Sequence, residues 1–135
     1  MNGPIYMAPM TAGDLDAVMA IEKASFGDPW SRAGFEDSLR LPFALMLTAK
    51  CGETVVGYCC LYQMVDEGEI INVAIAPDWR GQGVGLKMLE HFLNLGKERG
   101  IARFLLDVRV SNLPAQRLYE KAGFAIIARQ KNFYQ

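Results

Sequence analysis

The 135-residue sequence is poor in cysteine and histidine, and it has no excess of charge of either sign. Its three cysteines, Cys51, Cys59 and Cys60, are odd in number and form no CxxC pair, which argues against a disulfide framework or a cysteine-ligated metal site. We therefore predict buried, reduced thiols and no bound metal. The formal net charge of -1 disfavours a general nucleic-acid binder, because such proteins usually carry a basic patch or stripe.

Long hydrophobic runs are also lacking, and we expect no leader segment. No apolar run reaches the roughly 18 residues that a membrane span needs. Met1–Met10 does not combine a basic region with a long apolar stretch, so no signal peptide is predicted. We expect a cytoplasmic protein that binds neither a membrane nor nucleic acid directly.

The residues that are present suit one globular domain. Hydrophobic residues make up 51% of the chain and charged residues 21%, and the length predicts a single domain over residues 1–135. Apolar runs between turn signals predict strands at Ile5–Met10, Phe43–Ala49, Thr54–Gln63, Glu69–Ala76, Phe104–Val110 and Phe124–Arg129. Helical spacing and capping residues predict helices that start after Thr11, after Ser31, in the loop at Gly81–Gly85 and after Ser111–Asn112, with Gly100 capping the third.

The order of these elements predicts an α/β fold with a mixed, mostly antiparallel sheet. Phe43–Ala49 and Thr54–Gln63 are separated by a short turn that contains Gly52, which indicates a hairpin. A polar connection, Val65–Gly68, is expected before the next strand. That strand, the following helix and Phe104–Val110 form a crossover, so these two strands should be parallel. We expect helices on both faces of the sheet.

The most informative segment is the loop Arg80-Gly81-Gln82-Gly83-Val84-Gly85, which follows a strand and opens a long amphipathic helix. N–H groups at a helix start lack intrahelical partners and favour an anion such as phosphate. Glycine lets the backbone approach that anion closely, and Arg80 adds a permanent positive charge. An ordinary turn with close helix packing would use the same glycines. The spacing fits neither the dinucleotide-binding fingerprint nor the P-loop.

Arg80-x-x-Gly83-x-Gly85 resembles the Q/R-x-x-G-x-G/A signature of the GNAT acetyltransferase superfamily. Further segments resemble the RimI-type branch, whose members acetylate the N-terminal alanine of a ribosomal protein, and the similarity covers essentially the whole chain. These segments are Phe26–Ser31, Asn72–Ile75, Val108–Asn112 and Leu118–Phe124. The resemblance implies the GNAT fold, acetyl-CoA as co-substrate and the N-terminal segment of a protein, such as a ribosomal protein, as acceptor.

The resemblance also implies which residues bind acetyl-CoA. In the family, the strand before the loop holds the pantetheine arm, the loop and helix start hold the pyrophosphate, and an asparagine contacts the cofactor. In this chain the corresponding residues are Val73, Ala74, Ile75, Arg80, Gly81, Gln82, Gly83, Val84, Gly85, Leu86 and Asn112. A helix cap is a second role open to Asn112.

Tyr119 matches the family tyrosine that protonates the leaving thiolate, and a phenol O–H can donate its proton as charge develops on sulfur. Its alternative role is core packing. For the base, the RimI-type pattern has a glutamate where this chain has Asp107, and other GNAT branches use a glutamate at the position of Glu69. We expect Glu69 and Asp107 to share deprotonation of the amine; solvated surface charges are the alternative.

Several interpretations stay open from the sequence. The acceptor is expected to be a protein N-terminal α-amine, with a lysine or small-molecule amine as the enzymatic alternative and a catalytically weak acetyl-CoA-binding regulatory module as the other. Phe26 and Trp30 match the family segment that borders the peptide groove, or they pack the first two helices. RimI-type chains continue with one more strand where this sequence stops at Gln135, which predicts an unpaired edge strand and self-association.

Overall fold

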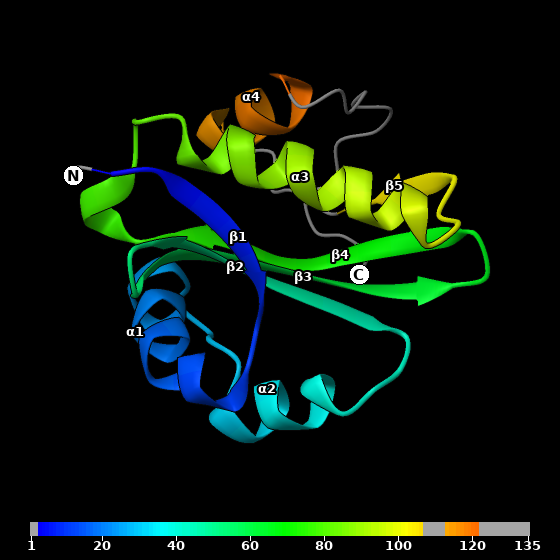
Figure 1. The fold of residues 1–135 in the computed structure, drawn as a ribbon, viewed down its shortest axis with the longest axis horizontal. Helices are drawn as coiled ribbons and strands as arrows, with labels where there is room; N and C mark the ends of the chain where they lie inside the picture. The colour runs from blue at the N-terminus through cyan, green and yellow to red at the C-terminus, as the bar shows by residue number, and fades with distance from the viewer. Residues whose placement is uncertain (1–2, 107–112, 122–135) are drawn as a thin grey trace.

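The computed structural model describes residues 3–106 and 113–121. Its strands form one sheet in the order β1-β2-β3-β4-β5, and they span Ile5–Pro9, Ala44–Cys51, Thr54–Met64, Glu67–Ile75 and Arg103–Leu105. Neighbouring strands from β1 to β4 are antiparallel, whereas β4 and β5 are parallel. The predicted mixed sheet, its hairpin and its parallel crossover are confirmed (Figure 1).

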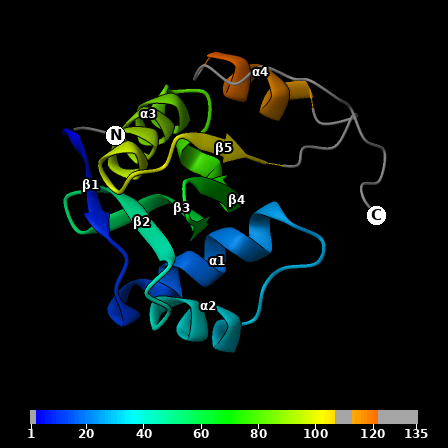
Figure 2. The same ribbon diagram turned by 90° about the vertical axis from the view of Figure 1, so that its right-hand side faces the viewer.

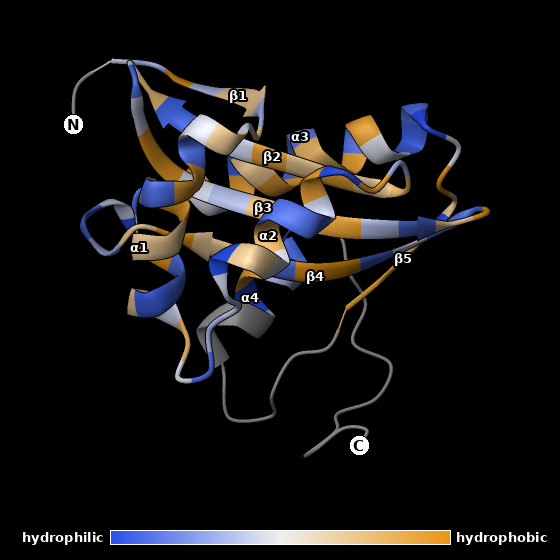
Figure 3. Cartoon of the chain, turned by 90° about the horizontal axis from the view of Figure 1, so that it is seen from below, coloured by the Kyte–Doolittle hydropathy of each residue, from blue (hydrophilic) through white to orange (hydrophobic). Residues whose placement is uncertain are grey.

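Helices cover both faces of the sheet, as the sequence predicts. The helices α1 (Leu15–Ser25) and α2 (Arg32–Leu39) lie on one face, and α3 (Val84–Glu98) and α4 (Leu113–Lys121) lie on the other (Figures 1 and 2). Hydrophilic and hydrophobic residues are mixed along α1 and α2, as expected for helices that bury one side (Figure 3). Among the described residues, no helix is both long and apolar enough to cross a membrane.

Local capping contacts begin and end these helices. A short 3-10 turn, η1 (Ala12–Asp14), leads into α1, and the Thr11 N–H donates to the Asp14 carboxylate at 2.9 Å. The Ser31 Oγ accepts from the Gly34 N–H at 3.0 Å at the start of α2. Gly100 follows α3 with a φ of 88°, the left-handed conformation expected of a glycine after a helix end. The caps predicted at Ser31 and Gly100 are therefore confirmed.

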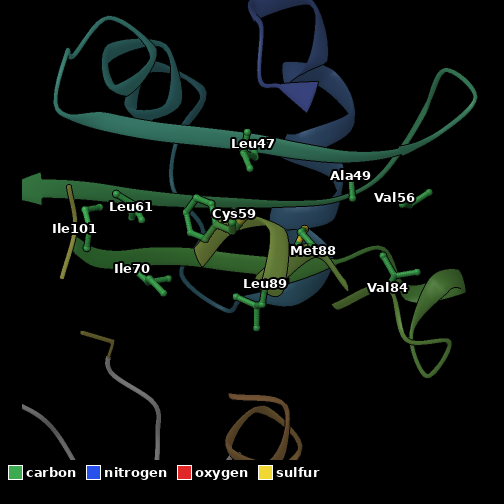
Figure 4. Packing of buried hydrophobic residues seen from close by; sticks show 11 residues of the cluster. Leu47, Ala49, Val56, Cys59, Leu61, Ile70, Val84, Met88, Leu89 and Ile101 are labelled. Carbon is green, nitrogen blue, oxygen red and sulfur yellow. The ribbon is translucent and has the colours of Figure 1, made fainter. Parts of the chain in front are cut away.

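The sheet separates two hydrophobic clusters. The cluster between the sheet and α3 contains Leu47, Ala49, Val56, Cys59, Leu61, Ile70, Val84, Met88, Leu89, Phe92 and Ile101 (Figure 4). The cluster under α1 and α2 includes Leu15, Val18, Phe35, Tyr58 and Cys60. Because neighbouring residues of a strand point to opposite faces, Cys59 and Cys60 enter different clusters. Both are buried free thiols, and burial raises the pKa of each.

One predicted boundary is wrong. The connection expected at Val65–Gly68 is shorter, because β4 begins at Glu67, where Glu67 pairs with Met64 and Gly68 with Gln63. Val65 and Asp66 alone make the turn, and Val65 has a φ of 56°. A β-branched residue rarely adopts positive φ, so the sequence carried no signal for a tight turn here.

Some predicted features lie outside the described residues. These are the strand Phe124–Arg129, the helix cap at Ser111–Asn112 and the candidate base Asp107. The strand predicted at Phe104–Val110 is described only in its first part, as β5.

Candidate functional site

A pocket of about 640 Å³ lies where the C-terminal ends of α1 and β4 meet the glycine loop and α4. It is lined by Ser25, Phe26, Val73, Ala74, Ile75, Trp79, Arg80, Gly81, Gly83, Gly85, Leu86, Arg117, Leu118, Tyr119 and Lys121. Residues from four separate parts of the chain therefore share one cavity, and most of the predicted cofactor-binding residues are among them.

The glycines of the loop serve two different purposes. Gly81 and Gly83 have φ angles of 75° and 83°, which side chains with a Cβ rarely adopt. Apart from chain neighbours, no heavy atom lies within 4 Å of a Cβ built at either position, so the space beside the backbone is open to a ligand. A Cβ at Gly85 would instead lie 3.2 Å from Leu118 Cδ2. Gly85 thus permits close packing of α4 on α3, as the packing interpretation expects, whereas the anion-binding role of Gly81 and Gly83 stays a prediction.

The start of α3 has backbone geometry that suits an anion. Gly83 is the residue before the helix, and its carbonyl accepts from the Lys87 N–H at 3.2 Å. The N–H groups of the first turn therefore have no partner inside the helix, and the helix dipole favours negative charge there. Because Gly83, Gly85 and Leu86 line the pocket, this end of α3 faces the cavity.

Arg80 joins the loop to two other elements as well as adding charge to the pocket. Its Nε donates to the Ile75 carbonyl at 3.0 Å, and its Nη2 donates to the Ser25 Oγ at 3.0 Å. Gln82, which the motif assigns to the cofactor, does not line the pocket, and its side-chain amide donates to the Asp78 carbonyl at 3.0 Å. Of the two polar side chains of the loop, that of Arg80 therefore lines the pocket and that of Gln82 does not.

The second half of β4, which lines the pocket, lies beyond a bulge in the sheet. The pairing with β3 shifts between Ile70 and Asn72, so Ile71 is an extra residue that forms a bulge. In the described part of the chain, β5 pairs with β4 only at Glu67–Glu69. Past the bulge, Val73, Ala74 and Ile75 line the pocket, and strand groups there that have no partner among the described strands on the β5 side can bind an extended ligand.

Tyr119 lies in α4 and lines the same pocket in a half-buried position. Burial, followed by the interaction with Cys59, raises the pKa of its phenol to about 12. The phenol therefore keeps its proton throughout the neutral pH range, as a proton donor must.

Three predicted site residues in the described ranges do not line the pocket. Gln82 is one, and Val84 is another, since its side chain is 4% exposed and belongs to the core. The third, Glu69, is exposed in the first half of β4, opposite Tyr62 and Leu105. The roles of Asp107 and Asn112 stay predictions, because both residues lie outside the described ranges.

Two basic residues that line the pocket were not predicted from the sequence. Arg117 and Lys121 are exposed on α4, one helical turn apart, on either side of Tyr119 along the chain. Their i, i+4 spacing beside a candidate acid was the available signal. Ser25 and Trp79 also line the pocket, but they reach it only because α1 packs on β4 and on η2 (Pro77–Trp79), which no local pattern encodes. Within the described ranges, no group of three histidine, cysteine or acidic residues is placed to hold a metal.

Comparison with known proteins agrees with this geometry. Residues 15–124 match the model of the acetyltransferase (GNAT) family. The chain is 38% identical over 126 residues to a Bacillus subtilis (strain 168) protein that is provisionally named ribosomal protein bS18-alanine N-acetyltransferase. That similarity covers 93% of this chain and 83% of the relative.

Two further proteins extend the comparison. The ribosomal protein bS18-alanine N-acetyltransferase of Escherichia coli (strain K12) is 33% identical, over 90% of this chain and 81% of the relative. The crystal structure of the Escherichia coli ribosomal-protein-S18-alanine N-acetyltransferase gives a TM-score of 0.83 at 30% identity, over 90% of this chain and 78% of that chain. The PaiA N-acetyltransferase of Thermoplasma acidophilum, in complex with coenzyme A, has a TM-score of 0.81 at 17% identity over 90% of both chains, a likeness of fold alone.

Proposed function

The chain belongs to the acetyltransferase (GNAT) family, and from this premise we propose that it transfers the acetyl group of acetyl-CoA to the N-terminal α-amine of a protein. The observation that carries the proposal is that one pocket joins the glycine loop at the start of α3 to the phenol of Tyr119. The names of the relatives, which specify alanine of ribosomal protein bS18, support a ribosomal protein as acceptor.

Acetyl-CoA fits the pocket by its chemistry. The pyrophosphate would lie against the N–H groups at the start of α3, beside the open space at Gly81 and Gly83. The amide-containing pantetheine arm would follow the backbone of Val73–Ile75 past the β4 bulge. Arg117 and Lys121 supply further positive charge at the same cavity. Asn112 is proposed as an additional cofactor contact on the strength of the family motif alone.

The proposed reaction is a direct transfer with both substrates bound. The neutral amine nitrogen attacks the thioester carbonyl carbon, the carbon–sulfur bond breaks, and the amine loses one proton to a base. The departing thiolate, whose free thiol has a pKa of about 8.5, takes a proton from Tyr119, and the phenolate and the protonated base then return to their starting states by proton exchange with water. The raised pKa of this phenol keeps the proton in place until negative charge develops on the sulfur.

For the base we propose that Glu69 and Asp107 share the deprotonation of the amine. Glu69 is exposed on the strand that later lines the pocket at Val73. Four residues of extended strand span about 13 Å, so Glu69 can act on an amine in the pocket only through water. We further propose that the protein works in the cytoplasm, where its buried thiols stay reduced.

The experiment that tests the acceptor uses a peptide that begins with alanine and contains one internal lysine. At pH 7 about a tenth of α-amines are neutral, against fewer than about one lysine side chain in a thousand. We expect mass spectrometry to place the acetyl group on the N-terminus after incubation with acetyl-CoA. The matched control is the same peptide with a formylated N-terminus, which should stay unmodified.

Two outcomes would contradict this proposal in different ways. Modification of the lysine alone would identify a lysine acetyltransferase and leave the cofactor site intact. Binding of acetyl-CoA without release of free thiol on any amine would identify a regulatory acetyl-CoA-binding module.

A further inference from the structure

A buried carboxylate with several donors lies between α1 and the sheet, bonded to residues that adjoin the pocket lining in sequence. Glu22, in the last part of α1, is 1% exposed. Its Oε1 accepts from the hydroxyl of Tyr58 and from the Asn72 side-chain amide at 2.9 Å. Its Oε2 accepts from the same amide at 3.1 Å and from the backbone N–H of Trp30 at 2.9 Å. Both oxygens are therefore satisfied by groups from β3, β4 and the connection between α1 and α2.

Packing alone does not account for an acidic residue at this position. A buried carboxylate carries a large desolvation penalty that only well-placed donors offset. Leu15, Val18 and Ile21 join the same helix to the sheet without that penalty. In the described part of the chain, no lysine or arginine forms an ion pair with Glu22. The carboxylate is better explained by the groups that it holds in place.

One of these groups belongs to the segment 26–30, which connects α1 to α2. Trp30 ends the segment, and its N–H is held by Glu22 while its indole packs on Phe35 with ring centroids 5.1 Å apart. At the other end, Ser25 accepts a hydrogen bond from Arg80. Between these attachments, Phe26 is 39% exposed and lines the pocket. The segment is thus held in place at both ends, and Ser25 and Phe26 form one wall of the pocket.

A second group held by Glu22 belongs to β4. Asn72 directly precedes Val73, the first residue of the strand that lines the pocket. A single carboxylate therefore sets the position of the segment 26–30 relative to this part of β4. The side of the pocket formed by the loop, α3 and α4 suits an anionic cofactor. Once that side is filled, the wall at Ser25 and Phe26 is what remains for an acceptor.

We propose that Glu22 is a positioning residue for acceptor binding: by holding Trp30 and Asn72 together, it places Phe26 at the rim of the pocket where the acceptor peptide enters. This inference rests on the proposed function, because it takes acetyl-CoA to occupy the loop side. Glu22 does not line the pocket, and Val73–Ile75 on the cofactor side keep their pairing with β3 without it, so its effect should fall mainly on the acceptor.

The test is Glu22→Gln, which keeps the size of the side chain but turns one acceptor oxygen into an NH₂ group that must face a donor. Because bonds to a charged acceptor are about twice as strong as neutral ones, we expect the KM for the alanine peptide to rise about tenfold. The KM for acetyl-CoA should stay within about twofold, since the glycine loop is untouched and Val73–Ile75 stay paired with β3. The Trp30 amide should exchange with solvent about tenfold faster by NMR, an effect that does not depend on catalysis.

Asp14→Asn is the matched control. Asp14 is the other buried carboxylate near α1, but it contacts Thr11 and Lys50 and not the segment 26–30. This variant should lose thermal stability while leaving both KM values unchanged. A folded Glu22→Gln protein with a wild-type peptide KM would overturn the inference, and so would an equal rise in KM in Asp14→Asn.

A second variant covers the case in which Glu22→Gln does not fold. Tyr58→Phe removes one hydroxyl donor and keeps the ring in the core, so a rise of about threefold in the peptide KM is expected. An unchanged peptide KM in this folded variant would then overturn the inference. If the wild-type protein acetylates only lysine, the proposed acceptor is wrong, whereas the role of Glu22 is judged by the KM for the lysine peptide.

Discussion

The two sides of the pocket are built in different ways. The loop side depends on local backbone geometry, namely the positive φ angles of Gly81 and Gly83 and the unpaired N–H groups at the start of α3. The side at Ser25 and Phe26 depends on side chains that meet across long stretches of sequence, such as Arg80 with Ser25. The loop side should therefore be sensitive to an added Cβ, and the other side to the loss of a single polar atom.

The largest effect is expected where chemistry and not binding is altered. Tyr119→Phe removes one hydroxyl from the loop side, and we expect kcat to fall by about 10²-fold, the range of general acid catalysis. The Kd for CoA, measured by calorimetry, should change little because the ring remains. Tyr6→Phe is the control, since Tyr6 donates to the Gly52 carbonyl away from the pocket and should keep full activity. Wild-type turnover in Tyr119→Phe would return Tyr119 to a packing role.

Two glycine variants sharpen the comparison within the loop itself. Gly83→Val forces a β-branched residue to a φ of 83°, with a strain of about 1–3 kcal/mol, and fills the space beside the anion site. We expect the affinity for CoA to fall at least about tenfold in calorimetric titrations. Gly85→Ala should be milder, because its Cβ would lie 3.2 Å from Leu118 Cδ2 and 3.6 Å from Ile75 Cγ1, and both are side-chain atoms that can move. Unchanged CoA binding by a folded Gly83→Val protein would remove the loop from the cofactor site.

The next largest effect on activity is expected for the two candidate bases, Glu69 and Asp107. Glu69→Gln and Asp107→Asn should each slow acetylation of the alanine peptide at pH 7, and they should lose less at pH 9, because an α-amine with a pKa of about 8 is then mostly neutral. The measurement is the ratio of variant to wild-type kcat/KM at the two pH values. A ratio that does not change with pH would exclude both residues as bases.

A smaller effect is expected on the wall at Ser25 and Phe26. Ser25→Ala removes the acceptor of the Arg80 Nη2 bond, whose loss is worth about 1 kcal/mol or about fivefold. We expect this change in the KM for the acceptor peptide, with the KM for acetyl-CoA less affected. A rise confined to acetyl-CoA would show that the contact serves the loop and not the wall.

The last prediction concerns stability at high pH and not activity. The pKa of Tyr119 rises from 10.0 to about 12 in the folded chain, so the folded state keeps a proton that the unfolded chain loses. The stability linked to this phenol is therefore fully present below pH 10 and is lost as the pH rises to about 12. Thermal melts should show a steeper fall of Tm over this range in the wild type than in Tyr119→Phe. Parallel curves would indicate that the phenol is not shielded.

Much of the fold could be predicted because its signals are local. Ser31 caps α2 through a bond to Gly34, and Gly100 ends α3 by its own positive φ. The apolar runs on either side of Gly52 predict a hairpin without reference to the rest of the chain. The turn at Val65 could not be predicted, because a valine takes a positive φ there only under the constraint of the paired strands on both sides.

In the candidate site, too, features with a local signal could be predicted, and features that depend on distant residues could not. The sequence by itself predicted the position of the glycine loop at the start of a helix, the tyrosine on the last described helix and two of the three expected buried thiols, since each depends on spacing or on residue type within a short segment. Only the tertiary structure decided that Gly85 serves packing, that Glu69 lies away from the pocket and that Glu22 is buried among donors. The physical reason is that a charged residue on a helix is assigned to solvent by any local rule. Its burial depends on partners such as Asn72, which lies 50 positions away along the chain.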